Sequence, residues 1–180
     1  MQLRALVGVA ALLPVSAFAT QYLSVAQVQA LAFPQADQFE PAQTLLDAAA
    51  VARLQAPAVS QLASGQLRYL VARKNGAPLG VLVIDEVIGK YERIQFAVAL
   101  DAEARVQQIE IMRYSESHGQ EVRLPAWRQQ FAGKPATAAL QVGRDIANIS
   151  GATLSCTHVT DGVRRLVTAV AALRAAGKLA

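Results

Sequence analysis

The stretch from Leu67 to Met112 constrains the fold more than any other part of this 180-residue sequence. Apolar residues alternate with polar or small ones in four successive runs, which is typical of strands that bury one face. Asn75-Gly76 separates the first two runs, and both residues accept the positive φ of a tight hairpin. Gly89-Lys90 and Asp101–Arg105 interrupt the later runs. The stretch therefore predicts a four-stranded antiparallel meander. In its last run the inward positions are Ile109 and Ile111, and the outward one is Glu110.

A long amphipathic helix is predicted after residue 153, because apolar residues recur there three and four positions apart. These residues are Val159, Val163, Leu166, Val167, Val170 and Leu173. Gly177 with Lys178 is a plausible end of this helix. Ala138–Val142 could add one more short strand. The fold class is therefore α+β, with an antiparallel sheet of about four to five strands flanked by helices.

Residues 20–66 are interpreted as an N-terminal helical segment. Ser24 followed by Gln27 forms a capping-box pattern, so a short helix is expected to run to about Leu31. Thr44–Leu54 is rich in alanine and is expected to be helical as well. Pro57 is a good first residue for another short helix, which would end near Leu62.

Residues 1–19 have the pattern of a secretory signal peptide. Arg4 gives the positive start, Leu6–Val15 the apolar core, and Ala17-Phe18-Ala19 the cleavage pattern. An uncleaved anchor is the alternative, but the apolar run is short for a bilayer and contains Pro14. The mature protein is expected to be periplasmic, with association to the membrane left open.

Charge and cysteine content exclude several classes of function. The formal charge of +4 falls to +3 when Arg4 is removed, and no basic cluster is interleaved with aromatic residues, so no nucleic-acid partner is expected. Cys156 is the only cysteine, which excludes an intrachain disulfide. With only His118 and His158 beside it, no metal site is expected.

Ser150-Gly151-Ala152-Thr153 is a run of very small residues directly before the predicted long helix. Such a run leaves the backbone N–H groups of the first helical turn open to an anion, and a phosphate would fit. Taken on physical grounds alone, a turn of this kind is more often just a tight connection between two elements.

The sequence of this run, SGAT followed by Leu154-Ser155 at the start of the last helix, resembles a motif of the FMN-binding domain family. That family includes the C subunit of the sodium-translocating NADH:quinone reductase and the G subunit of the Rnf electron-transport complex. In these proteins a flavin transferase joins FMN to the last threonine of SGAT through a phosphoester. The resemblance implies that residues 67–180 form an FMN-binding domain and that Thr153 carries FMN covalently.

A second motif supports the resemblance in the expected order along the chain. In the family, a loop containing glutamate and glycine lies close to the flavin and precedes an aromatic residue and a Gln-Phe-x-Gly sequence. The matching residues here are Glu116, Gly119, Glu121, Trp127, Gln130, Phe131 and Gly133. The cofactor-binding residues implied are Thr153, Ser150, Gly151, Ala152, Leu154, Ser155, Glu121, Gly119 and His118. As the alternative, which residues of this kind favour, Glu121 and His118 are solvated loop residues. Trp127 is either a platform for the cofactor or, as is more common, a core residue.

One position departs from the family pattern. The transferase signature has an aspartate six residues before the modified threonine, and that position is Ala147 here. An acid, Asp145, lies two residues earlier. Either Asp145 takes the role of the aspartate in a variant of the pattern, which is the interpretation that we favour, or recognition by the transferase is weakened.

The resemblance implies extracytoplasmic electron transfer between a membrane-bound redox partner and a quinone-linked or soluble acceptor. A flavin transferase would be needed for maturation, and an enzymatic activity of the chain itself stays open. Noncovalent FMN binding and a flavin-free binding module are the alternatives. A serine hydrolase using Ser150 or Ser155 with His158 and Asp161 is disfavoured, because no GxSxG turn is present.

Overall fold

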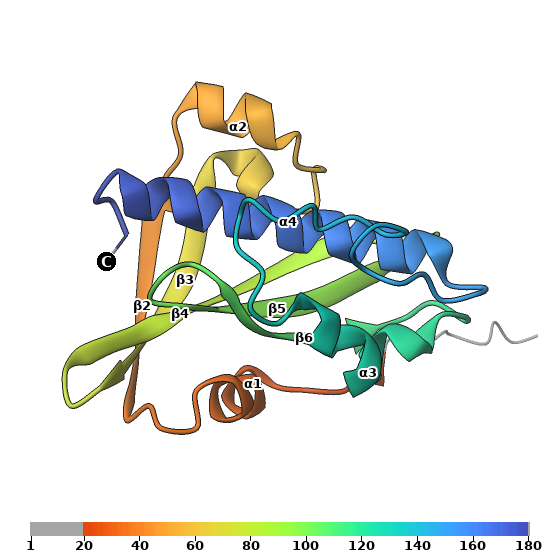
Figure 1. Cartoon of the computed structure of the whole chain (residues 1–180), viewed down its shortest axis with the longest axis horizontal. Coiled ribbons are helices and arrows are strands. Elements are labelled where there is room, and N and C mark those ends of the chain that lie inside the picture. Colours follow the sequence, from red (N-terminus) through yellow and green to blue (C-terminus); the bar gives the residue numbers. More distant parts are fainter. Residues whose placement is uncertain (1–19, 180) are drawn as a thin grey trace, which may run out of the picture.

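The computed structural model describes residues 20–179 and is built on one six-stranded antiparallel sheet, in the order β1-β6-β5-β4-β3-β2 (Figure 1). The strands are β1 (Thr20–Gln21), β2 (Gln38–Leu45), β3 (Gln66–Lys74), β4 (Ala77–Ile88), β5 (Arg93–Asp101) and β6 (Val106–Tyr114). The helices are α1 (Val25–Ala32), α2 (Ala48–Leu54), α3 (Pro125–Arg128) and α4 (Thr153–Ala175), with short 3-10 turns η1 (Gln61–Ser64), η2 (Gln120–Arg123) and η3 (Gln129–Phe131). The α+β class is confirmed, with more strands than predicted. The predicted signal peptide lies outside the described residues.

The predicted meander is confirmed as β3 to β6, each strand pairing with the next in antiparallel register. Asn75 and Gly76 form the β3–β4 hairpin with φ angles of 49° and 80°. These angles match the positive φ that a two-residue turn needs in order to follow the twist of its strands.

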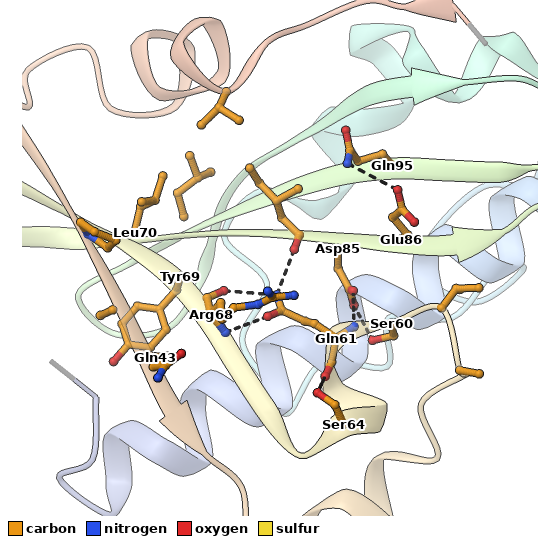
Figure 2. Close-up of a pocket in the computed structure, with 17 residues that line it drawn as sticks. Gln43, Ser60, Gln61, Ser64, Arg68, Tyr69, Leu70, Asp85, Glu86 and Gln95 are labelled. Atoms are coloured by element: carbon orange, nitrogen blue, oxygen red, sulfur yellow. Dashed lines mark hydrogen bonds between the residues drawn. The ribbon is translucent and has the colours of Figure 1, made fainter. Parts of the chain in front are cut away.

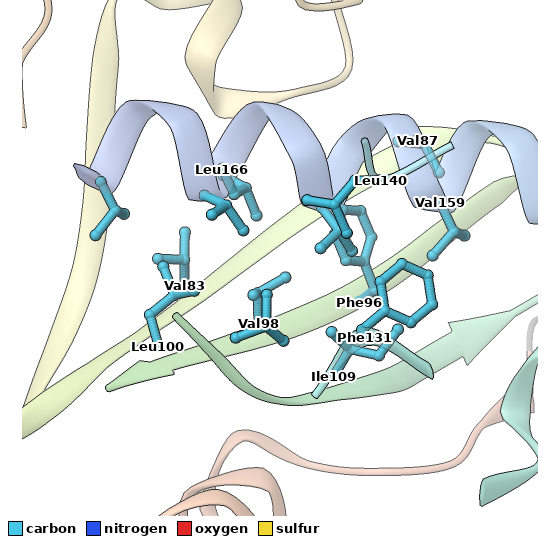
Figure 3. Close-up of a cluster of buried hydrophobic side chains, with 14 of the residues drawn as sticks. Val83, Val87, Phe96, Val98, Leu100, Ile109, Phe131, Leu140, Val159 and Leu166 are labelled. Carbon is cyan, nitrogen blue, oxygen red and sulfur yellow. The ribbon is translucent and has the colours of Figure 1, made fainter. Parts of the chain in front are cut away.

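Helix α4 covers one face of the sheet and forms the main core with it (Figure 1). Its apolar stripe, which includes Val159 and Leu166, faces alternate residues of β4 and β5 such as Val83, Phe96 and Val98 (Figure 3). The helix ends as predicted, because the N–H groups of Gly177 and Lys178 turn back to bond carbonyls of the last turn. The predicted helical period therefore fixes which face of α4 is buried.

Helix α1 packs on the other face of the sheet, where the intervening residues of the strands make a smaller core (Figure 1). The predicted capping box is present, since Ser24 Oγ accepts from Gln27 N at 3.3 Å and Gln27 Oε1 accepts from Ser24 N at 2.8 Å. Val28 and Ala32 are the buried residues of α1.

The prediction of a helix from Thr44 was wrong at its start. Residues 38–45 form β2, which pairs with β3 along its whole length, and α2 begins only at Ala48 after the cap residue Asp47. The backbone bonds offered by β3 outweigh the weak helical preference of this stretch. The helix predicted from Pro57 is instead the 3-10 turn η1.

The extra strand predicted at Ala138–Val142 does not form. Only one isolated bridge joins Val142 to Ile146, because the chain turns here and Leu140 has a φ of 42°. Two N–H groups of this turn bond to the carboxylate of Asp145 rather than to a strand.

Glu110 was predicted to face solvent, but it is buried on the α1 face of the sheet. Its carboxylate forms an ion pair with Arg128 of α3 and accepts a bond from Gln108 Nε2 at 2.6 Å. Arg128 also donates to the backbone oxygen of Ile109, which lies on the outer edge of β6. The pair therefore ties α3 to a strand edge that β1 is too short to cover.

Asp85 is a second buried carboxylate, 5% exposed beneath α4. It accepts bonds from Ser60 Oγ at 2.6 Å and from Gln61 N at 2.9 Å. Burial raises the pKa of Asp85 above its ordinary value of 3.8, although these two bonds and the charge of Arg165 oppose that shift. The folded protein therefore holds this proton more tightly than the unfolded chain does.

Replacing Asp85 by asparagine is expected to change how stability depends on pH. Because the pKa of Asp85 is higher in the folded protein, the protonated carboxyl contributes to the stability of wild type below pH 3.8. This stability is lost as pH rises through the folded pKa. The free energy of unfolding of Asp85→Asn, relative to that of wild type, should therefore increase as pH rises. Urea unfolding of both proteins at a series of pH values measures this difference. Glu103→Gln, at an exposed turn, serves as the control and should keep the wild-type slope. Parallel curves for Asp85→Asn and wild type would contradict the prediction.

Candidate functional site

The SGAT run forms a tight turn into the N-terminus of α4. Gly151 has a φ of 80°, and nothing lies within 4 Å of the position that a Cβ would take. Ala152 precedes the helix and is buried, whereas Ser150 and Thr153 are exposed. Thr153 is the first residue of α4, so its hydroxyl stands at the open end of the longest helix described.

The N-terminus of α4 has no side-chain cap, in contrast to α1 and α2, which Ser24 and Asp47 cap. The first bond of α4 runs from Cys156 N to Ala152 O, so the three N–H groups before it have no carbonyl within the helix. Such groups carry the positive end of the helix dipole and suit the oxygens of a phosphate. The residues present therefore fit the phosphate of FMN.

Asn148 contacts the hydroxyl of Thr153 directly. Its side-chain Nδ2 donates to Thr153 Oγ1 at 3.1 Å. No sequence pattern marks Asn148, because five positions separate it from Thr153 and only the fold of the loop brings the two side chains together.

The predicted loop residue Gly119 lies against the SGAT turn. A Cβ at Gly119 would lie 2.9 Å from the Cβ of Ala152 and 2.6 Å from the hydroxyl oxygen of Tyr114. Gly119 also has a φ of 88°, which side chains rarely adopt. Two motifs that lie more than 30 residues apart in the sequence are thus in van der Waals contact.

Tyr114, at the end of β6, joins the loop to the helix. Its hydroxyl donates to the backbone oxygen of His118 at 2.5 Å and shares a bond with Ser155 Oγ at 2.9 Å. Burial raises the pKa of Tyr114 above 10.0, and the negative charges of Glu116 and Glu121 add to that effect against the Ser155 bond. The phenol therefore stays protonated and acts as a donor throughout the neutral range. Sequence reasoning did not single out this residue.

The remaining predicted residues differ in what they can offer a ligand. Ser155 is buried, and its hydroxyl bonds to Tyr114, so its side chain holds the first turn of α4 against β6 and is not open to a ligand. Leu154 is 45% exposed beside Thr153. His118 and Glu121 are exposed on the loop and on η2, and the ring of His118 bonds to Ser117 Oγ.

Glu116, in the loop that follows β6, bonds to the neighbouring β4–β5 turn. Its Oε1 accepts bonds from Tyr91 N at 2.6 Å and Glu92 N at 2.9 Å. His158 of α4 bonds through Nδ1 to the backbone oxygens of Ile88 and Gly89. The two side chains hold this turn beside the first turns of α4.

Trp127 belongs to the core, which decides between the two interpretations that its sequence context allowed. It is 4% exposed and makes an edge contact with Phe131, with ring centroids 5.0 Å apart. Its indole Nε1 donates to the backbone oxygen of Ala147 at 2.9 Å. Trp127 therefore fixes the start of the loop that leads to the SGAT turn.

Asp145 is engaged away from Thr153. Its carboxylate accepts bonds from the N–H groups of Leu140 and Gln141 and pairs with Lys134 at 3.1 Å. Burial acts to raise the pKa of Asp145, but these bonds and the lysine outweigh burial and lower it. Asp145 thus stabilises its own turn, and this geometry gives no support to the interpretation that it replaces the missing aspartate.

The residues considered for a serine hydrolase are not assembled. Ser155 bonds to Tyr114, His158 bonds to the backbone of Ile88 and Gly89, and Asp161 pairs with Arg164. Within residues 20–179 no three histidine, cysteine, aspartate or glutamate residues cluster as metal ligands would. Among the same residues, no helix has the length and apolarity needed to span a bilayer.

A hollow of about 850 Å³ lies apart from these residues, beside β2, β3 and β4 (Figure 2). The side chain of Gln61 enters it where β3 and β4 separate, accepting from Arg68 N at 2.7 Å and donating to Ile84 O at 2.9 Å. None of the predicted cofactor-binding residues lines this hollow.

Comparison with known proteins matches residues 89–168 to a family described as the FMN-binding domain. Every predicted cofactor-binding residue falls within this span. No curated protein matches the chain. Among solved structures, the crystal structure of Shewanella oneidensis NqrC is similar at 17% identity and a TM-score of 0.48, over 76% of this chain and 78% of that one. The match of residues 89–168 to the FMN-binding domain family supports a flavin-binding protein.

Proposed function

We propose that this chain is an extracytoplasmic electron-transfer flavoprotein that carries FMN through a phosphoester on Thr153. The observation that carries the proposal is the place of this threonine. Within the span that matches the FMN-binding domain family, its hydroxyl is exposed at a helix N-terminus that no side chain caps. The chemistry supplied by the bound group is electron transfer through the isoalloxazine ring.

A covalent bond suits a cofactor that must be kept outside the cytoplasm. A helix N-terminus attracts an anion by only about 0.3–1 kcal/mol at exposed sites. Even a Kd near 1 μM, about −8 kcal/mol, would allow FMN to be lost by dilution. A phosphoester removes dissociation, and the helix N–H groups would then orient the phosphate.

The side chains divide the work between attachment and shaping. Thr153 supplies the esterified oxygen, and Gly151 and Ala152 leave the backbone open to the phosphate. Ser150 is exposed on the same turn and can donate to a phosphate oxygen. Glu121 and His118 are the exposed loop groups that would border the flavin, because Gly119 between them packs against Ala152.

Export and partners complete the proposal. Residues 1–19 would direct the chain to the periplasm, where a flavin transferase would attach the FMN. A membrane-bound redox partner would then exchange electrons with the flavin, and the acceptor would be quinone-linked or soluble.

The test is co-expression with a flavin transferase followed by intact mass measurement. Wild type is expected to gain the mass of one FMN less one water, and its yellow colour should survive denaturation. Thr153→Ala should gain no mass, because the attacking oxygen is absent. Thr157→Ala, which removes a hydroxyl one helical turn further on, should still be modified.

Each alternative gives a different result in the same experiment. Noncovalent FMN binding predicts a yellow protein of unmodified mass that loses its colour on denaturation. A flavin-free module predicts a colourless protein. Modification that persists in Thr153→Ala would move the attachment to another residue and overturn the assignment.

A further inference from the structure

We propose that Asn148 is a positioning residue for the attachment of FMN to Thr153, an inference that rests on the proposed function. Its amide Nδ2 lies 3.1 Å from Thr153 Oγ1, the oxygen that would form the phosphoester. Both side chains are exposed, so a transferase can reach the oxygen without displacing buried structure.

The backbone next to Asn148 is held in place from the core. The carbonyl oxygen of Ala147 accepts from Trp127 Nε1 at 2.9 Å, and the N–H of Ala147 donates to Gln130 Oε1 at 2.7 Å. On the other side, Ile149 O accepts from Ala152 N at 3.0 Å and closes the turn. Asn148 therefore projects from a fixed backbone, which keeps its amide beside the hydroxyl before any partner arrives.

The direction of the bond suits attack by the threonine oxygen. An amide nitrogen only donates, so Thr153 Oγ1 is the acceptor and its own proton is free to leave toward another group. As that proton leaves, negative charge builds on the oxygen, and a fixed N–H donor stabilises this charge.

Neighbouring side chains do not supply the same contact. Ala147 has only a methyl group, and Asp145 is bonded to Leu140 N, Gln141 N and Lys134. The hydroxyl of Ser155 faces Tyr114 on the buried side of the helix. Asn148 is thus the side chain of this loop that contacts the reacting oxygen.

The step that Asn148 would assist is the transfer of a flavin phosphate from a phosphoanhydride donor, such as a flavin dinucleotide. The Thr153 Oγ1–P bond forms and the anhydride P–O bond breaks. Its electron pair departs with the nucleoside monophosphate, and the threonine proton passes to a base on the transferase or to water. No oxidant or reductant is consumed.

The test follows the mass gain over time with purified chain, purified flavin transferase and a flavin dinucleotide. Asn148→Ala is expected to be modified about tenfold or more slowly than wild type, because one donor to the developing oxyanion is lost. Its melting temperature should stay close to that of wild type, since the bond is exposed. Gln141→Ala, which removes another exposed amide from the same connection, should react at the wild-type rate.

Asn148→Asp separates a positioning role from simple bracing of the turn. An ionised carboxylate cannot donate, so this variant should be slow at neutral pH. Its rate relative to wild type should rise as pH falls toward the carboxyl pKa of about 4, because the protonated acid donates again. Bracing alone predicts a ratio that is independent of pH.

Failure of the inference is distinct from failure of the proposed function. If wild type is modified and both Asn148 variants react at the wild-type rate, Asn148 has no positioning role. A faster reaction of Asn148→Asp at neutral pH would also overturn the inference, because it would require an acceptor at this position. If wild type itself gains no mass, the proposed function fails.

Discussion

Replacing Trp127 by alanine is expected to lower the free energy of unfolding by about 3–5 kcal/mol. The indole is almost fully buried and packs edge-on against Phe131, so its loss leaves a cavity that the sheet and α4 cannot close. The bond from Nε1 to Ala147 O is lost as well. Urea unfolding of purified wild type and variant measures the difference.

Two further variants separate packing from hydrogen bonding. Trp127→Phe keeps an aromatic body but removes the N–H, so its cost should be well below that of Trp127→Ala. Leu124→Ala, at an exposed residue beside the same helix, should change the free energy of unfolding by no more than about 0.5 kcal/mol. A Trp127→Ala protein as stable as Leu124→Ala would show that this side chain does not support the core.

Replacing Gly162 by valine is expected to lower the free energy of unfolding by about 2–3 kcal/mol. A Cβ at this position would lie 2.6 Å from Cζ of Phe96 and 3.1 Å from Cγ1 of Val87. The Phe96 ring is fully buried between α4 and the sheet, so it cannot move aside without displacing other core residues (Figure 3). The helix must then shift away from β4 and β5.

Gly162→Ala should lower the free energy of unfolding by less than Gly162→Val does. Both variants place a Cβ against the Phe96 ring, but alanine adds no further atoms and gains about 1 kcal/mol of helix propensity over glycine. Thr168→Ala, on the exposed side of α4, improves propensity without a clash and should leave the melting temperature unchanged or slightly raised. Equal stability of wild type and Gly162→Val would mean that α4 does not approach the sheet this closely.

Elements defined by short-range patterns were predictable. Alternation located β3 to β6, Asn75-Gly76 located their first hairpin, and a capping box located the start of α1. Each of these signals depends on residues within about four positions of one another. No comparable signal marked β2, which forms because β3 offers it eight paired residues.

In the candidate site, too, local motifs were predictable from the sequence and contacts between distant residues were not. SGAT and the Glu- and Gly-containing loop were recognisable as motifs, and residues 89–168 match the family that they resemble. The contact of Gly119 with Ala152, the Tyr114 bonds and the approach of Asn148 to Thr153 join residues that no local pattern relates. The partners of Asp145 were equally hidden, since its carboxylate bonds to a turn at Leu140 and Gln141 where the sequence predicts a strand.

The sequence by itself determined the meander, the buried stripe of α4 and the threonine at the start of that helix, because periodicity and small-residue turns act locally. Only the tertiary structure decided that Glu110 pairs with Arg128, that Trp127 lies in the core, and which side chain contacts the Thr153 hydroxyl. These outcomes depend on which distant backbone groups meet once the sheet has paired and α4 has packed across it. The free energy that favours these contacts comes from burial and hydrogen bonding between segments far apart in the chain. A short window of sequence therefore does not predict them.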